Sequence, residues 1–168
     1  MILVIAETPR LRIRHLTAAD SAFTCRLLNE PSFIENIADR GVRSELDAMH
    51  YLAEGPIKSY QQYGYGLFLV EHSESQTPLG FCGLLFREYL QETDIGFAFL
   101  PQFWGKGYAF EAASAVMQFG YHKLNLKRIV GLTSAGNTGS VKVLNRLGLQ
   151  FEKMVQMQPA AEYVQLYS

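Results

Sequence analysis

The chain has 168 residues, of which 48% are hydrophobic and 18% are charged, and its formal net charge at pH 7 is −1. This composition is typical of a globular chain with a sizeable core, which we expect to form a single domain over residues 1–168, and it excludes an intrinsically disordered protein. The near-neutral charge gives no strong field for a nucleic-acid backbone, and no apolar run is long enough to cross a membrane.

Cysteine and histidine usage indicates neither a metal centre nor an exported protein. Cys25 and Cys82 lie in apolar surroundings, and the four histidines have no metal-ligand spacing, so we expect reduced core cysteines and no metal. The first ten residues, MILVIAETPR, lack the basic leader and long apolar region of a signal peptide. We therefore expect a cytoplasmic protein.

The first predicted element is a strand over Leu11–Leu16. Arg10, Arg12 and Arg14 alternate with apolar residues at its start. Because side chains on a strand point alternately to its two faces, we expect the three arginines on the solvent-facing side.

Two helices and a strand pair follow. A hydroxyl cap and a first-turn acid predict a helix from Thr17 to about Asn29. A second helix covers Ser44–Glu54 and ends or kinks at Gly55-Pro56. Two nearly continuous apolar runs, Tyr65–Glu71 and Leu79–Phe86, predict neighbouring strands joined by a turn.

The strand predicted over Thr93–Leu100 has two unlike faces. Asp94, Gly96 and Ala98 point to one side, and aromatic and branched residues point to the other. A succession of Gly and Ala leaves a trough on the first face. The trough either allows close packing under a helix or leaves room for a ligand.

The second half of the chain predicts a strand–helix–strand unit and two closing strands. A helix covers Gly107–Leu124, a strand Lys127–Ser134 and a short helix Gly139–Leu147. Phe151–Gln156 and Tyr163–Tyr167 predict the last two strands. The fold class is therefore α/β with adjacent antiparallel strands.

The segment LPQFWGKGYAFEAA, residues 100–113, places two glycines between a strand and a helix. A glycine loop that opens a helix presents unpaired backbone N–H groups at the positive end of the helix dipole, and such a site binds phosphate or pyrophosphate. Neither the P-loop pattern nor the dinucleotide fingerprint is present, because no Gly-Lys-Ser or Gly-Lys-Thr occurs and Phe110 stands where the third glycine is needed.

Three motifs in order resemble the GCN5-related N-acetyltransferases (GNAT), especially the branch of the Rim-type ribosomal-protein N-acetyltransferases. Pro101–Ala112 resembles its acyl-CoA loop, Glu7–Arg14 the opening of the branch, and Asn137–Gly148 its second cofactor motif. The loop fits in two registers. Gln102-x-x-Gly105-x-Gly107 matches the general pattern best, and we prefer the Rim-like register, in which Trp104 takes the Gln/Arg place and Gly107 and Ala109 the small positions.

The resemblance implies a single-domain GNAT-like fold: a mixed, mostly antiparallel central sheet with a splayed parallel strand pair, flanked by about four helices. It also implies direct transfer of an acetyl group from acetyl-CoA to a primary amine within a ternary complex. The acceptor would be a protein N-terminal α-amine or a small-molecule amine, and the assembly a monomer or homodimer.

Site residues follow from the same resemblance. It implies that Asn137 binds the pantetheine arm, although a helix cap also suits this asparagine. It also implies that Ser140 binds the cofactor and either orients a water or protonates the leaving thiolate, and an ordinary helix hydroxyl is an equal alternative. The other expected cofactor-binding residues are Phe97, Ala98, Phe99, Gly105, Lys106, Gly107, Tyr108, Ala109 and Phe110. Lys142 and Arg146 are either phosphate contacts or solvated cations.

The proton chemistry departs from the wider family. Leu144 stands where many members have a tyrosine acid, and Leu132 where others have a base. Asp94, on the trough face, is the candidate base, with Glu92 in reserve, and a water chain alone is the alternative. These departures keep a second function open, a catalytically silent acyl-CoA-binding or sensing module, and RNA or ribosome docking is a weaker third.

The acceptor is expected over the first two helices. Their polar residues Glu30, Glu35, His50 and Tyr51 are able to hold an amine, and nothing in the sequence selects among them.

Overall fold

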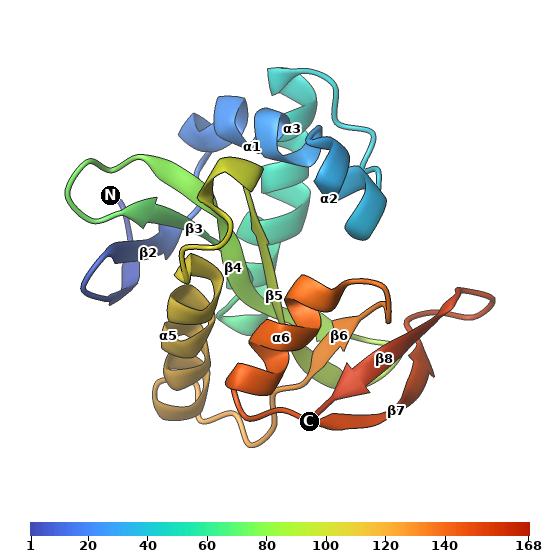
Figure 1. The fold of residues 1–168 in the computed structure, drawn as a ribbon. Helices are drawn as coiled ribbons and strands as arrows, with labels where there is room; N and C mark the ends of the chain where they lie inside the picture. Colours follow the sequence, from blue (N-terminus) through green and yellow to red (C-terminus); the bar gives the residue numbers. More distant parts are fainter.

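The computed structural model describes residues 1–168 and builds two β-sheets flanked by helices (Figure 1). The strands are β1 (Val4–Glu7), β2 (Leu11–His15), β3 (Leu67–His72), β4 (Pro78–Arg87), β5 (Glu92–Phe99), β6 (Gly131–Thr133), β7 (Phe151–Gln156) and β8 (Tyr163–Tyr167). The α-helices are α1 (Ser21–Leu28), α2 (Pro31–Asn36), α3 (Glu45–Leu52), α4 (Lys58–Tyr63), α5 (Tyr108–His122) and α6 (Thr138–Arg146). The mixed α/β class and the closing strands are confirmed.

The larger sheet is antiparallel and follows the chain in the order β1-β2-β3-β4-β5. Its strands β4 and β5 pair in continuous register from Gly80 opposite Phe99 to Arg87 opposite Glu92. The smaller sheet has the order β6-β8-β7 and is also antiparallel.

A single parallel bridge joins the two sheets. The N–H of Ile95 on β5 donates to Val130 O at 2.8 Å, and the N–H of Val130 donates to Thr93 O at 2.9 Å. No further pairing continues along β5 and β6, so the two strands separate beyond this point. The splayed parallel pair is confirmed, although β6 is shorter than the strand predicted over Lys127–Ser134.

Helices cover both faces of the larger sheet (Figure 1). Residues of α1 to α3 pack with Leu69 and Phe81 in one core cluster, and α5 packs with Phe68, Leu84 and Ile95 in the other. The helix predicted to end or kink at Gly55-Pro56 does not end there, since a π-helical turn at Ala53–Ile57 carries it from α3 into α4. The wider turn accommodates the proline within the helix.

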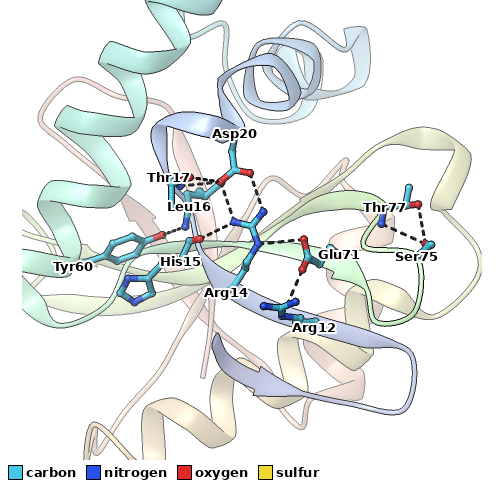
Figure 2. A network of polar contacts seen from close by, with 10 residues as sticks. All are labelled: Arg12, Arg14, His15, Leu16, Thr17, Asp20, Tyr60, Glu71, Ser75 and Thr77. Atoms are coloured by element: carbon cyan, nitrogen blue, oxygen red, sulfur yellow. Dashed lines mark hydrogen bonds and ion pairs between the residues drawn. The ribbon is translucent and has the colours of Figure 1, made fainter. Parts of the chain in front are cut away.

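The prediction that the arginines of β2 face solvent is wrong. Arg14 is buried and donates to both Asp20 carboxylate oxygens, at 3.0 and 2.9 Å, and to Glu71 at 3.2 Å (Figure 2). Arg12 approaches the other Glu71 oxygen at 3.6 Å. Losing one partner of such a buried pair typically costs about 3–5 kcal/mol. The network therefore ties β2 and β3 to the start of α1.

No helix combines the length and the apolar character that a membrane crossing requires. Both cysteines are free thiols. Cys82 is fully buried on β4, where burial raises the pKa of its thiol, and Cys25 is half-buried on α1.

Candidate active site

The loop between β5 and α5 has the backbone of an anion site. Gly105 (φ 74°) and Gly107 (φ 81°) adopt the left-handed conformation that glycine accepts without strain, and Gly107 caps the 15-residue helix α5. None of the N–H groups of Gly105–Phe110 donates to another part of the chain. Lys106 and both glycines are exposed. A run of free N–H groups at the positive end of a long helix is suited to a pyrophosphate.

Two hydrogen bonds anchor the start of this loop. The indole Nε1 of Trp104 donates to Phe99 O at 2.9 Å, and the N–H of Phe103 donates to Leu100 O, also at 2.9 Å. The tryptophan of the Rim-like register thus fixes the end of β5 to the loop, while its ring stays half exposed, at 53%.

The β1–β2 turn lies against the first turn of α5, a contact that the sequence analysis missed. Glu111 accepts from Thr8 Oγ1 at 2.6 Å and from Arg10 Nε at 2.7 Å. Burial would raise the pKa of the Glu111 carboxyl, but these hydrogen bonds hold it below its ordinary value. Glu111 is part of the loop motif through the letters A-x-E-A, but no local sequence pattern indicates that Thr8 and Arg10 contact it.

A groove of about 560 Å³ runs along α5 between this turn and α6. Its lining includes Arg10, Gly107, Phe110 and Arg146. The Arg146 guanidinium lies 3.9 Å from the centre of the Phe110 ring, a cation–π contact across the two helices. Arg146 has no carboxylate partner, so its charge is available at the edge of the groove, and Lys142 on the same helix is likewise exposed without an ion-pair partner.

The separation of β5 from β6 exposes one edge of β5. Because the Ile95 N–H points toward β6, the two-residue repeat turns the Phe97 N–H the same way, where it has no partner. The continuous β4–β5 register shows no bulge here, so strand separation frees this amide instead. The Phe99 carbonyl already accepts a hydrogen bond from Trp104 Nε1. Ala98 lies opposite Phe81 in the β4 ladder, so it offers its small side chain rather than its backbone.

The trough on β5 is partly filled. A Cβ at Gly96 would lie 2.9 Å from Leu85 Cδ1, so packing explains this glycine. The same point lies 3.7 Å from Asp94 Oδ1, and Gly96 and Ala98 are themselves only half-buried. The face that carries Ala98 turns toward the layer of α1 to α3.

Asp94 is buried on this face, with 3% of its side chain exposed. Its Oδ2 accepts from Arg87 Nε, while Oδ1 lies on the Gly96 side. Burial raises the pKa of the Asp94 carboxyl, and Arg87 counteracts the increase. The reserve candidate Glu92 is instead occupied by Arg128 Nε, at 3.0 and 3.2 Å.

The second cofactor motif forms the start of α6. Asn137 Oδ1 accepts from the Ser140 N–H at 3.2 Å, so the asparagine caps the helix and its Nδ2 is left without a partner. The Ser140 hydroxyl is half-buried and has no partner in the chain. Leu144 is buried in the main core, and its side chain fills the space beside Gly131, where an added Cβ would lie 2.4 Å from Leu144 Cδ2.

Of the expected acceptor residues, Tyr51 on α3 packs against the same core cluster as Ala98 of the trough. It is half-buried, burial raises its pKa, and the charges of Arg40 and Arg87 act on it. Glu35 and His50 are exposed on α2 and α3, and Glu30 is half-buried just before α2.

Known proteins are similar to this chain in sequence and in fold. The family described as the acetyltransferase (GNAT) domain matches residues 10–150. YkkB of Bacillus subtilis (strain 168) is 27% identical over 161 residues, 93% of this chain and 92% of YkkB. The N-acetyltransferase p20 of Bacillus licheniformis is 27% identical over 152 residues, 89% of this chain and 84% of p20.

Among solved structures, RimL, a ribosomal L7/L12 α-N-protein acetyltransferase in complex with coenzyme A, has a TM-score of 0.83. It is 17% identical, and the match covers 98% of this chain and 96% of RimL. The chain belongs to the GNAT family and is an acetyltransferase.

Proposed function

We propose that the protein is an acetyl-CoA-dependent N-acetyltransferase that acetylates a primary amine by direct transfer in a ternary complex. The observation that carries this proposal is the run of free N–H groups at Gly105–Phe110, which opens a long helix beside the groove. The coenzyme A complex of RimL and the acetyl-CoA complex of the acetyltransferase MccE support the choice of donor.

The chain offers a continuous set of groups for such a donor. The loop amides and the dipole of α5 would hold the pyrophosphate, with Arg146 available for a further phosphate. The free Nδ2 of Asn137 would hold the pantetheine arm between β5 and α6, and the unpaired N–H of Phe97 would meet the acyl end of the donor. The residues present therefore fit acetyl-CoA, and they lie on separate elements that the splayed strands bring together.

When bound, the donor supplies an activated acetyl thioester. The Phe97 N–H, which has no partner in the chain, would polarise the thioester carbonyl at the splayed edge, following the logic of an oxyanion hole. The Ser140 hydroxyl would give a proton to sulfur, and the Oδ1 side of Asp94 would receive the amine proton, directly or through water.

The acceptor would enter from the α1–α3 layer, onto which the trough face of β5 opens. We propose a protein N-terminal α-amine or a small-molecule amine, in line with the ribosomal-protein activity of RimL and the name FsC-acetyl coenzyme A-N(2)-transacetylase of an Aspergillus fumigatus relative. Two free thiols are compatible with the reducing cytoplasm, which we propose as its location. We propose a monomer or a homodimer as the assembly.

A thiol-release assay tests the proposal. The full chain is mixed with acetyl-CoA and a panel of N-terminal peptides and small amines, and free CoA thiol is followed over time. We expect release that depends on the amine, with the acetylated product identified by mass spectrometry. Binding of acetyl-CoA without any amine-dependent release would favour a silent acyl-CoA-binding module, for which the buried Leu144 and the Arg87-bound Asp94 also argue.

Replacing Ser140 with alanine is expected to lower turnover about 10- to 100-fold while KM for acetyl-CoA stays within a few-fold, because a lost proton donor acts on the chemical step. Steady-state kinetics with the best amine of the panel measure both constants. Thr138→Ala, which removes an exposed hydroxyl from the same helical turn, is the control. Equal turnover in Ser140→Ala and the native chain would show that sulfur takes its proton elsewhere.

A further inference from the structure

The β1–β2 turn orients one peptide of the glycine loop. Arg10 Nη1 donates to Lys106 O at 2.9 Å, across nearly a hundred residues of sequence. In a planar trans peptide the C=O and the following N–H point in opposite directions. Arg10 therefore holds the Lys106 carbonyl toward the turn and directs the Gly107 N–H away from it. Gly107 has a positive φ, and Arg10 Nη2 is the one atom found within 4 Å of its Cβ position, at 3.4 Å, so Arg10 is the side chain that contacts this peptide.

Arg10 is itself fixed by Glu111. Its Nη2 lies 2.6 Å from Glu111 Oε2, its Nε donates to the same oxygen, and its backbone N–H donates to Oε1 at 3.2 Å. The guanidinium also lies 4.4 Å from the centre of the Tyr108 ring. Thr8 completes the arrangement by donating to Glu111 at 2.6 Å. We name Thr8, Arg10 and Glu111 the loop clamp.

The charges of the loop clamp have a consequence for an anion. Glu111 places a carboxylate in the first turn of α5, where it opposes any phosphate bound there. Arg10 neutralises this carboxylate and still has uncommitted N–H groups, because a guanidinium carries five. Its side chain is 41% exposed, lines the groove, and lies 3.4 Å from the point where a Cβ of Gly107 would stand.

We propose that Arg10, held by Glu111 and Thr8, is a positioning residue for the diphosphate of the acyl donor. It fixes the Lys106–Gly107 peptide, which leaves the Gly107 N–H free for the diphosphate, and it places a positive charge at the edge of the groove. This inference rests on the proposed function, because it names a further residue of the same donor site.

Binding measurements separate this role from a purely structural one. The full chain and Arg10→Gln are titrated with coenzyme A by calorimetry and with pantetheine, which lacks the diphosphate, by ligand-observed NMR. We expect Arg10→Gln to bind coenzyme A about 10- to 100-fold more weakly, the range for losing hydrogen bonds to a charged group. Pantetheine binding should be unchanged. Coenzyme A affinity within twofold of the native value, or an equal loss for both ligands, would overturn the proposal.

Inorganic pyrophosphate provides a probe that does not depend on the donor. In protein labelled with ¹⁵N-glycine, we expect the Gly107 amide resonance to move on titration with pyrophosphate, and to move little in Arg10→Gln. The resonance is assigned by its absence in Gly107→Ala. If the native chain binds no coenzyme A, the donor proposal fails, and this titration still decides the role of Arg10. An equal response in both proteins contradicts it.

Two further variants serve as second test and control. Arg10→Lys keeps the positive charge but loses the planar fork that contacts Glu111 and Lys106 O together, and we expect a weaker effect in the same direction. Arg43→Gln removes an exposed ion pair of the same 2.6 Å length, with Asp39 in the loop before α3, and should leave both titrations unchanged.

Discussion

Coenzyme A is expected to lose its stabilising effect on the protein when Gly107 is replaced by glutamate. In the native chain, ligand at about 100 times its Kd should raise Tm by about 5–10 °C, because binding to the folded state alone stabilises a protein of this size. The variant places a side chain and a negative charge beside the free loop amides. Repulsion at this range weakens binding by about 100- to 1,000-fold, so the shift should vanish. Thermal unfolding with and without coenzyme A measures it.

Gly41→Glu is the matched control for this experiment. Gly41 also has a positive φ, 70°, and its Cβ position is open, but it lies in the loop before α3. Both variants carry the strain of a non-glycine residue at positive φ, about 1–2 kcal/mol, so their unliganded Tm values should fall alike. If Gly107→Glu keeps the full rise in Tm on adding coenzyme A, the glycine loop is not part of the donor site.

Local patterns were sufficient to predict most elements. Period-2 alternation located β2 and β5, nearly continuous apolar runs located β3 and β4, and helical spacing with a glycine start located α5, because these signals lie within a few residues of each element. β1 was not predicted, since Val4–Glu7 becomes a strand by pairing with β2 rather than by its own pattern. The π-helical turn at Ala53–Ile57 was also missed, because a Gly-Pro pair ordinarily breaks a helix.

Charged partners distant in sequence could not be predicted. Alternation places Arg12 and Arg14 on one face of β2 but cannot reveal that Glu71 and Asp20 make that face a buried ion network. The same limit hid the link between Arg10 and Glu111. Tertiary partners, not periodicity, decide whether a strand of arginines faces water.

The candidate site, too, could be predicted from the sequence only in part. The motifs placed the glycine loop and Asn137 on the elements that the structure gives them, and left open the roles that depend on neighbours. The structure makes Asn137 a helix cap with a spare donor, and it fills the Gly96 side of the trough with Leu85. The Asn137 cap is a local contact with Ser140 that the sequence analysis kept open, whereas the filling of the trough depends on Leu85 from β4, which no local pattern contains.

Asp94 is expected to act on the amine and not on the donor. In the native chain, turnover should rise with pH through the pKa of Asp94, which burial raises, and then level off, because only the ionised carboxylate accepts a proton. Asp94→Asn keeps the size of the side chain but removes this acceptor. We expect turnover to fall about 100-fold or more and to keep rising up to pH 9, while Kd for coenzyme A stays within a few-fold. The pH profile of kcat measures the effect.

Two variants around the same strand make this test specific. Glu92→Gln removes the neighbouring carboxylate that Arg128 already occupies, and it should keep the native pH profile. Arg87→Gln leaves Asp94 in place but removes the cation that lowers its pKa, so the rising limb should move to higher pH with the plateau retained. If Asp94→Asn keeps full turnover from pH 6 to 9, a water chain carries the amine proton and the buried Asp94–Arg87 pair serves the fold alone.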